Sequence, residues 1–179
     1  MISINVVSDN SVVEYAAEEL RKYLLMMSCD EDIEIVKDKS EGGFRLGLFS
    51  DLSINPVSVP DPLIDDALYA EVSESGGIIA GINPRSVLLS VYELLRRNGC
   101  RWLFPGKEGE YIPHGKLKPT RFTVVPSSRF RGPCIEGACS QAHILETIDF
   151  LPKVGMNLFM SQFDLPTVFY ARYAKNNYS

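Results

Sequence analysis

Two apolar runs and the helix that follows them constrain the fold of this chain more than any other feature. Residues 68–73 and 77–82 have the apolar pattern of strands, and only Glu74, Ser75 and Gly76 separate them. So short a connection containing glycine predicts an antiparallel hairpin. A sheet with this hairpin cannot be wholly parallel, and no glycine-rich phosphate loop opens either strongly marked helix. Both points argue against an open nucleotide-binding fold.

The helix after the hairpin carries clear signals at both ends. Asn83 is a suitable N-cap, Pro84 suits the first helical position, and Gly99 can end the helix. Apolar residues recur on one face at helical spacing: Val87, Leu88, Val91, Leu94 and Leu95. This spacing predicts a helix that packs its apolar face on the sheet.

The remaining elements of residues 1–125 indicate an α+β fold. Ser11 and Glu14 fit the capping box of a second helix. Further strands are predicted over residues 2–7, 33–36, 44–49, 100–104 and 122–125. The polar, proline-rich residues 50–66 are predicted to form a surface loop. This order predicts a mixed sheet with helices packed on one side. Trp102 is expected in the core, although an indole could also stack on a sugar.

The pattern changes after Val125. Pro126-Ser127-Ser128 is typical of a linker, and residues 126–179 are predicted to form a second unit. Its elements are a strand over 130–135, a helix from about 141 to 153 capped by Ser140, and a strand over 157–163. Two parallel strands and one helix leave apolar surface in water unless more chain or another subunit covers it. Residues 126–179 are therefore expected to pack against further chain or another subunit.

Composition and charge exclude several functional classes. Hydrophobic residues make up 45% of the chain and charged residues 23%, as in soluble globular proteins. The net charge is -5 and the basic residues are scattered, which argues against a nucleic-acid partner. No apolar run approaches the roughly 20 residues that cross a bilayer. The first residues, MISINVVSDNSV, lack the pattern of a signal peptide. We therefore expect a cytoplasmic protein without a membrane partner.

Familiar catalytic and metal-binding patterns are absent from the sequence. Cys134 and Cys139 are close in sequence but have no ligand cluster around them, and all four cysteines are expected to be thiols. His114 and His143 have no cysteine or acidic residue at a familiar ligand offset. No Gly-x-Ser-x-Gly motif occurs. We therefore predict no metal site, no cofactor and no nucleophilic triad.

One region resembles a known family. The positions concerned are Gly81-Ile82-Asn83-Pro84-Arg85-Ser86-Val87, Tyr92-Glu93-Leu94-Leu95, Gly99-Cys100-Arg101-Trp102-Leu103-Phe104-Pro105-Gly106 and Gly109-Glu110-Tyr111-Ile112-Pro113. They resemble the N-terminal domain of bacterial α-glucuronidases, and the analogous domain of β-hexosaminidases is more distantly similar. The resemblance covers roughly residues 1–125. In these families the domain precedes a (β/α)8 barrel that carries the catalytic carboxylates. The resemblance therefore implies that residues 126–179 are the first strand, helix and strand of such a barrel, truncated here.

The resemblance also implies where a sugar would be contacted. Phe130-Arg131-Gly132 is similar to the first barrel strand of β-hexosaminidases, whose arginine binds sugar hydroxyls. This implies a substrate-binding role for Arg131. Glu136 and Asp164 follow the two predicted barrel strands, at the end where barrel active sites form. We expect Glu136 to contact substrate, with a solvated loop carboxylate as the alternative, and we assign no catalytic residue.

Two hypotheses about function follow. The first is that the chain is the N-terminal, non-catalytic portion of a carbohydrate-active glycoside hydrolase-like protein, inactive alone. Its partners would be a carbohydrate substrate and the missing barrel or another subunit. The second is a free-standing α+β module that binds a protein or a glycan, alone or as an oligomer.

Overall fold

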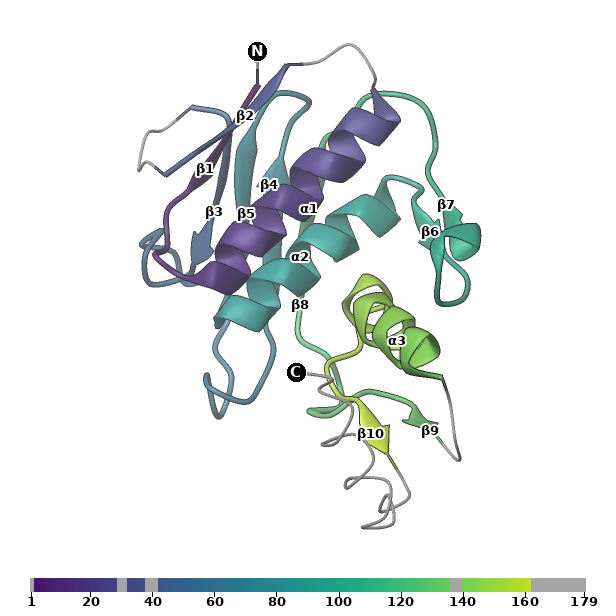
Figure 1. Cartoon of the computed structure of the whole chain (residues 1–179). Helices are drawn as coiled ribbons and strands as arrows, with labels where there is room; N and C mark the ends of the chain where they lie inside the picture. The colour runs from purple at the N-terminus through teal and green to yellow at the C-terminus, as the bar shows by residue number, and fades with distance from the viewer. Residues whose placement is uncertain (1, 29–31, 38–41, 136–139, 162–179) are drawn as a thin grey trace.

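The chain folds around a six-stranded mixed sheet, in a computed structural model that describes residues 2–28, 32–37, 42–135 and 140–161. The strand order is β2-β1-β3-β5-β4-β8. The strands are β1 (Ile2–Val6), β2 (Ile33–Val36), β3 (Phe44–Leu48), β4 (Leu68–Val72), β5 (Gly77–Gly81) and β8 (Thr120–Val124). Helices α1 (Ser11–Met27) and α2 (Pro84–Arg97) lie side by side on one face of the sheet (Figure 1). The predicted α+β class is confirmed.

The predicted hairpin is present. Strands β4 and β5 pair antiparallel from Leu68↔Gly81 to Val72↔Gly77, whereas β2, β1, β3 and β5 are mutually parallel. The turn requires a glycine at position 77, where φ is 142°. A Cβ there would lie 2.2 Å from the carbonyl oxygen of Glu71. Local sequence therefore determines where the sheet changes from parallel to antiparallel pairing.

The main core lies between the sheet and the two helices. Its largest fully buried side chains include Tyr23, Tyr92, Phe44, Ile4, Leu20 and Leu46. A smaller apolar cluster contains Phe49, Leu52 and Ala80, and residues from the irregular segment 50–66 pack against it. That segment is the predicted loop, but Leu52, Ile54, Val57 and Val59 pack in this cluster, whereas Leu63 is exposed.

Both α-helices of residues 1–125, called the first domain below, are capped by asparagine. The Asn83 Oδ1 atom accepts a hydrogen bond from the Ser86 backbone nitrogen at 2.9 Å, as predicted for α2. The prediction for α1 is wrong by one residue. Asn10, rather than Ser11, has the extended backbone of an N-cap, and its Oδ1 atom accepts from the Val12 nitrogen at 2.9 Å.

A small hairpin lies outside the main sheet. It consists of β6 (Arg101–Trp102), the 3-10 helix η1 (Lys107–Gly109) and β7 (Glu110–Tyr111). Trp102 is buried, as expected. The prediction of a buried strand over 100–104 is otherwise wrong, because β6 ends at Trp102 and both Leu103 and Phe104 are exposed. The chain turns there so that the Leu103 nitrogen can donate to the Gly109 oxygen.

The second unit contains β9 (Cys134–Ile135), α3 (Gln141–Lys153) and β10 (Met160–Ser161). Strands β9 and β10 are parallel neighbours, and α3 packs against α2. Ser140 caps α3, as predicted. The predicted strand over 130–135 is too long, because only its last two residues form β9. The proposed boundary between residues 125 and 126 stays a prediction.

No helix in the part of the chain that the structure describes is long and apolar enough to span a membrane.

Candidate functional site

The side chain of Arg131 lies in a network of hydrogen bonds within the chain. Its Nη2 atom donates to Asp66 Oδ2 at 2.8 Å, and its Nε atom donates to the Gly155 carbonyl at 2.9 Å. Its Nη1 atom donates to the Ser128 carbonyl at 2.7 Å. All three guanidinium nitrogens therefore already have acceptors. The proposed sugar contact of Arg131 stays a prediction.

Asp66 is the centre of this network and is fully buried. Its Oδ1 atom accepts from Arg85 Nε at 2.9 Å and from Ser86 Oγ at 3.0 Å. Its Oδ2 atom accepts from Arg131 and, at 2.7 Å, from Asn157 Nδ2. These five residues are called the Asp66 cluster below. Because two of them belong to α2 and two to residues 126–161, the cluster joins the second unit to the first domain.

The electrostatics of the Asp66 cluster favour the ionised carboxylate. Burial on its own would raise the pKa of Asp66. The hydrogen bond from Arg131 and the charge of Arg85 outweigh burial, and the net result is a pKa below the usual value. Asp66 is therefore charged at neutral pH and paired with two guanidinium groups.

Glu136 lies outside the described residues, and so does Asp164. The structure therefore brings Arg131 beside Asp66 but does not place it relative to Glu136. The substrate-binding role assigned to Glu136 stays a prediction. His114 and His143 are exposed. Within residues 2–28, 32–37, 42–135 and 140–161, no group of three or more histidines, cysteines or acidic residues could hold a metal ion.

A second polar network converges on Glu110 in β7. Its Oε1 atom accepts from the Tyr23 hydroxyl at 2.9 Å, from Trp102 Nε1 at 3.1 Å and from Lys153 Nζ at 2.8 Å. These four residues are called the Glu110 cluster below. They come from α1, β6, β7 and α3, so the cluster connects helix α3 to the first domain.

The Glu110 cluster contains a buried ion pair. The side chain of Lys153 is only 6% exposed and that of Glu110 only 13%. Burial disfavours the charge on Lys153, but hydrogen bonds to Asp149 and Glu110 raise its pKa above the usual value. Burial likewise opposes ionisation of Glu110, but the hydrogen bond from Lys153 helps to hold its pKa below the usual value. Both groups are therefore charged at neutral pH.

Aromatic packing holds the donors of this cluster in place. The rings of Tyr23 and Trp102 meet edge to face with centroids 5.1 Å apart, and Tyr92 contacts Trp102 in the same way at 5.4 Å. Such geometry is favourable for aromatic pairs. Burial is the main cause that raises the pKa of Tyr23, so its hydroxyl remains a donor. Trp102 is thus a core residue and not an exposed sugar platform.

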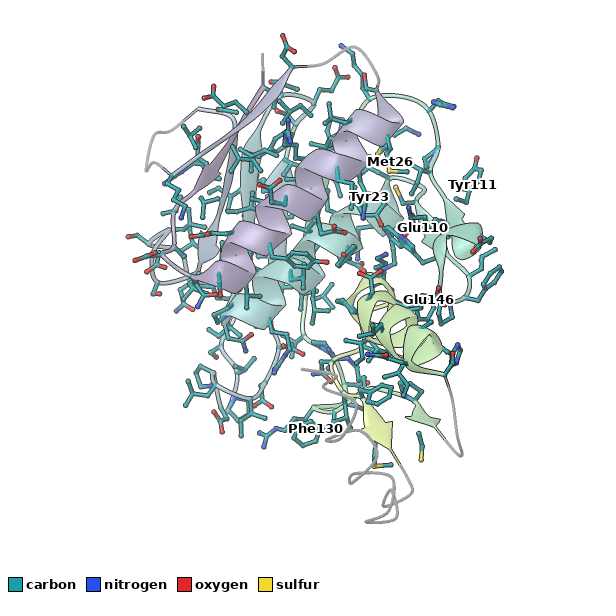
Figure 2. The ribbon with its side chains drawn as sticks, viewed as in Figure 1. Tyr23, Met26, Glu110, Tyr111, Phe130 and Glu146 are labelled. Carbon is teal, nitrogen blue, oxygen red and sulfur yellow. The ribbon has the colours of Figure 1, made fainter. Side chains whose placement is uncertain are left out.

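A cleft of about 610 Å³ opens above the Glu110 cluster. Its lining includes Met26 of α1, Glu110 and Ile112, and Glu146 and Lys153 of α3. Figure 2 labels Met26 of α1, Glu110 of β7 and Glu146 of α3, the three elements between which the cleft lies. Sequence reasoning missed this cleft. The available signal was Glu110 within the resembling Gly109–Pro113 stretch, but nothing local relates it to α3.

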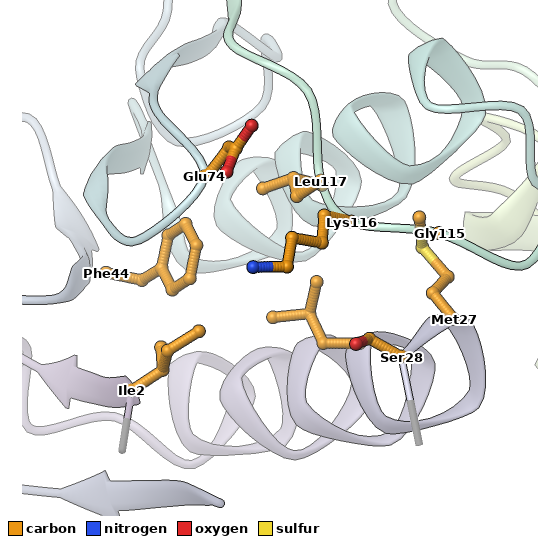
Figure 3. Close-up of a pocket in the computed structure, with 9 residues that line it drawn as sticks. Ile2, Met27, Ser28, Phe44, Glu74, Gly115, Lys116 and Leu117 are labelled. Atoms are coloured by element: carbon orange, nitrogen blue, oxygen red, sulfur yellow. The ribbon is translucent and has the colours of Figure 1, made fainter. Parts of the chain in front are cut away.

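Another hollow contrasts with the cleft in size. Figure 3 shows a pocket with Ile2, Phe44, Met27 and Leu117 in its lining. Its volume is about 10 Å³. That is at most room for one water molecule, so we do not consider it a ligand site.

The chain shows only low similarity to known proteins. No protein-family model and no curated protein matches the chain. Among solved structures, the chain is similar to a GH138 enzyme targeting pectin rhamnogalacturonan II, with a TM-score of 0.46 and 16% identity over 74% of this chain. It is also similar to CpGH84D, with a TM-score of 0.40 and 16% identity over 74% of this chain. The chain spans 17% and 22% of those two structures, respectively.

Proposed function

We propose that the chain is the N-terminal, non-catalytic portion of a carbohydrate-active glycoside hydrolase-like protein, and that it is inactive alone. The proposal starts from the sequence resemblance described above. The observation that carries it is the parallel pairing of β9 and β10, the strands that precede and follow α3 in the chain. Strand, helix and parallel strand form the repeating unit of a (β/α) barrel.

Exposed apolar side chains on the second unit support this proposal. Ile148 of α3 is 46% exposed. Phe130, Leu158 and Met160 are exposed as well. Parallel strands in complete folds are covered on both faces. In the proposed protein, later barrel elements would cover these side chains.

The contacts of α3 support an accessory role for the α+β domain. The Asp66 and Glu110 clusters connect the second unit to α1, α2 and the β6–β7 hairpin. In this role the domain would hold the first strand and helix of the barrel in a fixed orientation. Arg131 and Glu136 remain the residues proposed to contact the sugar. For Arg131, a sugar oxygen could accept from the second N–H of Nη2, beside Asp66, or from Nη1 in place of the Ser128 or Arg129 carbonyl.

An activity assay on the intact chain tests the non-catalytic assignment. The purified chain is incubated with 4-nitrophenyl glucuronides and N-acetylhexosaminides, and nitrophenol release is followed against buffer. We expect no turnover. Turnover that co-elutes with the chain during gel filtration and disappears in Glu136→Gln would show that the chain carries its own active site.

Light scattering tests the alternative of a free-standing oligomeric module. We expect a monomer whose stability is nearly unchanged by Ile148→Glu, because that side chain is already in contact with water. A stable dimer that dissociates in Ile148→Glu would instead mean that a second copy covers the face, and would favour the alternative.

A further inference from the structure

We propose that the cleft between α1, the β6–β7 hairpin and α3 binds a neutral saccharide. This inference goes beyond the proposed function, because it concerns residues of the first domain and α3 and needs no barrel. Binding in this cleft would produce no turnover. Turnover by the chain would therefore contradict the proposed function alone, and absence of sugar binding would contradict this inference alone.

The charges that line the cleft cancel. Three are positive and three negative: Lys22, Lys107, Lys153, Glu110, Glu146 and Asp149. A charged ligand would meet opposite and like charges in equal number. A neutral ligand with many hydroxyl groups can donate to the carboxylates and accept from the ammonium groups. Charge balance therefore favours a sugar without an acidic or basic group.

Glu110 provides a fixed acceptor at the base of the cleft. Its Oε1 atom is occupied by Tyr23, Trp102 and Lys153. Among the residues that the structure describes, the hydrogen bonds to this carboxylate all end on Oε1 and none on Oε2. Because three donors already orient the carboxylate, a ligand hydroxyl would bind Oε2 with little loss of side-chain freedom. Hydrogen bonds to charged acceptors are also stronger than those between neutral groups.

Apolar side chains complete the cleft. Met26, Ile112 and Leu145 line it together with the charged residues. They offer a surface for the C–H face of a sugar ring, while the carboxylates and ammonium groups face its hydroxyls. The volume of about 610 Å³ lies within the range of small-molecule sites. The volume, the lining side chains and the charge balance of the cleft thus all suit a neutral sugar.

The single tryptophan provides a direct reporter. The Trp102 indole N–H donates to Glu110 Oε1 at 3.1 Å, so its NMR resonance is sensitive to ligands on that carboxylate. The intact chain is titrated with methyl β-glucoside, N-acetylglucosamine and cellobiose. Sodium glucuronate and glucosamine serve as charged counterparts. We expect a saturable shift with at least one neutral sugar and weaker binding of its charged counterparts.

Matched variants locate the binding. Glu146→Gln and Leu145→Arg change residues that line the cleft and are exposed, so folding should be preserved. Glu146→Gln should raise the dissociation constant at least about fivefold, the loss expected for one charged hydrogen bond. Leu145→Arg should also raise it, because a long cationic side chain replaces apolar surface in the cleft. Glu18→Gln on α1 and Ile148→Arg on α3 alter exposed residues outside the cleft and should leave it unchanged.

Three results would overturn the proposal. The first is that none of the neutral sugars gives a saturable shift in the folded protein. The second is tighter binding of glucuronate or glucosamine than of the neutral sugars, which would contradict the charge argument. The third is an equal effect of the lining and control variants, which would place the binding elsewhere.

Discussion

Replacing Lys153 by methionine tests the claim that a buried ion pair fastens α3 to the first domain. Methionine retains an unbranched apolar stem but has no ammonium group. In the variant, Glu110 keeps the hydrogen bonds from Tyr23 and Trp102 but loses its positively charged partner. Asp149 loses the same partner but is half exposed, so water can solvate it. The cost should therefore arise mainly at Glu110.

The expected loss can be worked from burial. Removing one partner of a buried ion pair typically costs about 3–5 kcal/mol, because an uncompensated charge is left behind. Glu110 borders the cleft and retains 13% exposure, which places this pair at the lower end of that range. For a chain of this size, a loss of about 3 kcal/mol lowers the melting temperature by about 6–12 °C.

The loss should depend on pH in a defined direction. The folded pKa of Glu110 lies below its unfolded value of 4.5, so its contribution is present above pH 4.5 and is lost as pH falls through the folded pKa. The folded pKa of Lys153 lies above its unfolded value of 10.5, so its contribution is lost only in strong alkali. In Lys153→Met, burial without the ammonium raises the pKa of Glu110. Because the unfolded pKa is common to both chains, the stability gap should narrow as pH falls from the raised pKa of Glu110 in the variant to its lowered pKa in the parent chain.

Urea denaturation followed by Trp102 fluorescence measures this gap at neutral and acidic pH. The matched control is Lys107→Met, which removes a lysine from the same cleft. Lys107 is exposed, so its removal should cost less than about 1 kcal/mol. Equal losses in the two variants, or a gap for Lys153→Met that does not change with pH, would refute the reasoning.

Three further predictions concern Asp66, Gly77 and Cys100. Asp66→Asn leaves Arg85 and Arg131 without a carboxylate, so we expect a loss of about 2–4 kcal/mol and faster hydrogen exchange in residues 140–161, measured by mass spectrometry; unchanged exchange would contradict a docking role. Gly77→Ala places a Cβ against a carbonyl oxygen at φ 142° and should cost about 1–3 kcal/mol in urea denaturation; a neutral variant would contradict it. Burial raises the pKa of Cys100 to about 11, so iodoacetamide should modify it at pH 8 only after unfolding, as detected by peptide mapping; rapid modification of the folded chain would contradict it.

The elements that sequence predicts well carry their signals locally. Asn83 and Pro84 start α2 by their own chemistry, and Gly77 permits the hairpin turn by its own backbone. The α+β class follows from such signals because each one identifies an element before any tertiary contact forms. The order of strands in the sheet carries no comparable local signal and is known only from the structure.

The elements that sequence predicts poorly depend on distant partners. Residues 100–104 have the apolar pattern of a core strand, but only Trp102 among residues 101–104 enters the core, where it meets Tyr23 and Tyr92. The β6–β7 pair is outside the main sheet, so Leu103 has nothing to pack against and is exposed. An alternation of apolar residues indicates a strand but cannot indicate which sheet it joins.

The two polar clusters show why the candidate site was harder to predict than the fold. Asp66 and Glu110 resemble solvated acids in the sequence, but their partners Arg131 and Lys153 lie 65 and 43 residues away along the chain. A buried carboxylate is costly unless it is paired with good geometry. Glu110 therefore gains its cationic partner, and Asp66 its second guanidinium group, only when the second unit occupies one particular orientation. In other orientations Glu110 would lack a cation and Asp66 would keep only Arg85, so the clusters select the position of α3 more than they add net stability. The shape of the cleft above Glu110 depends on that selection, because α3 forms one of its walls.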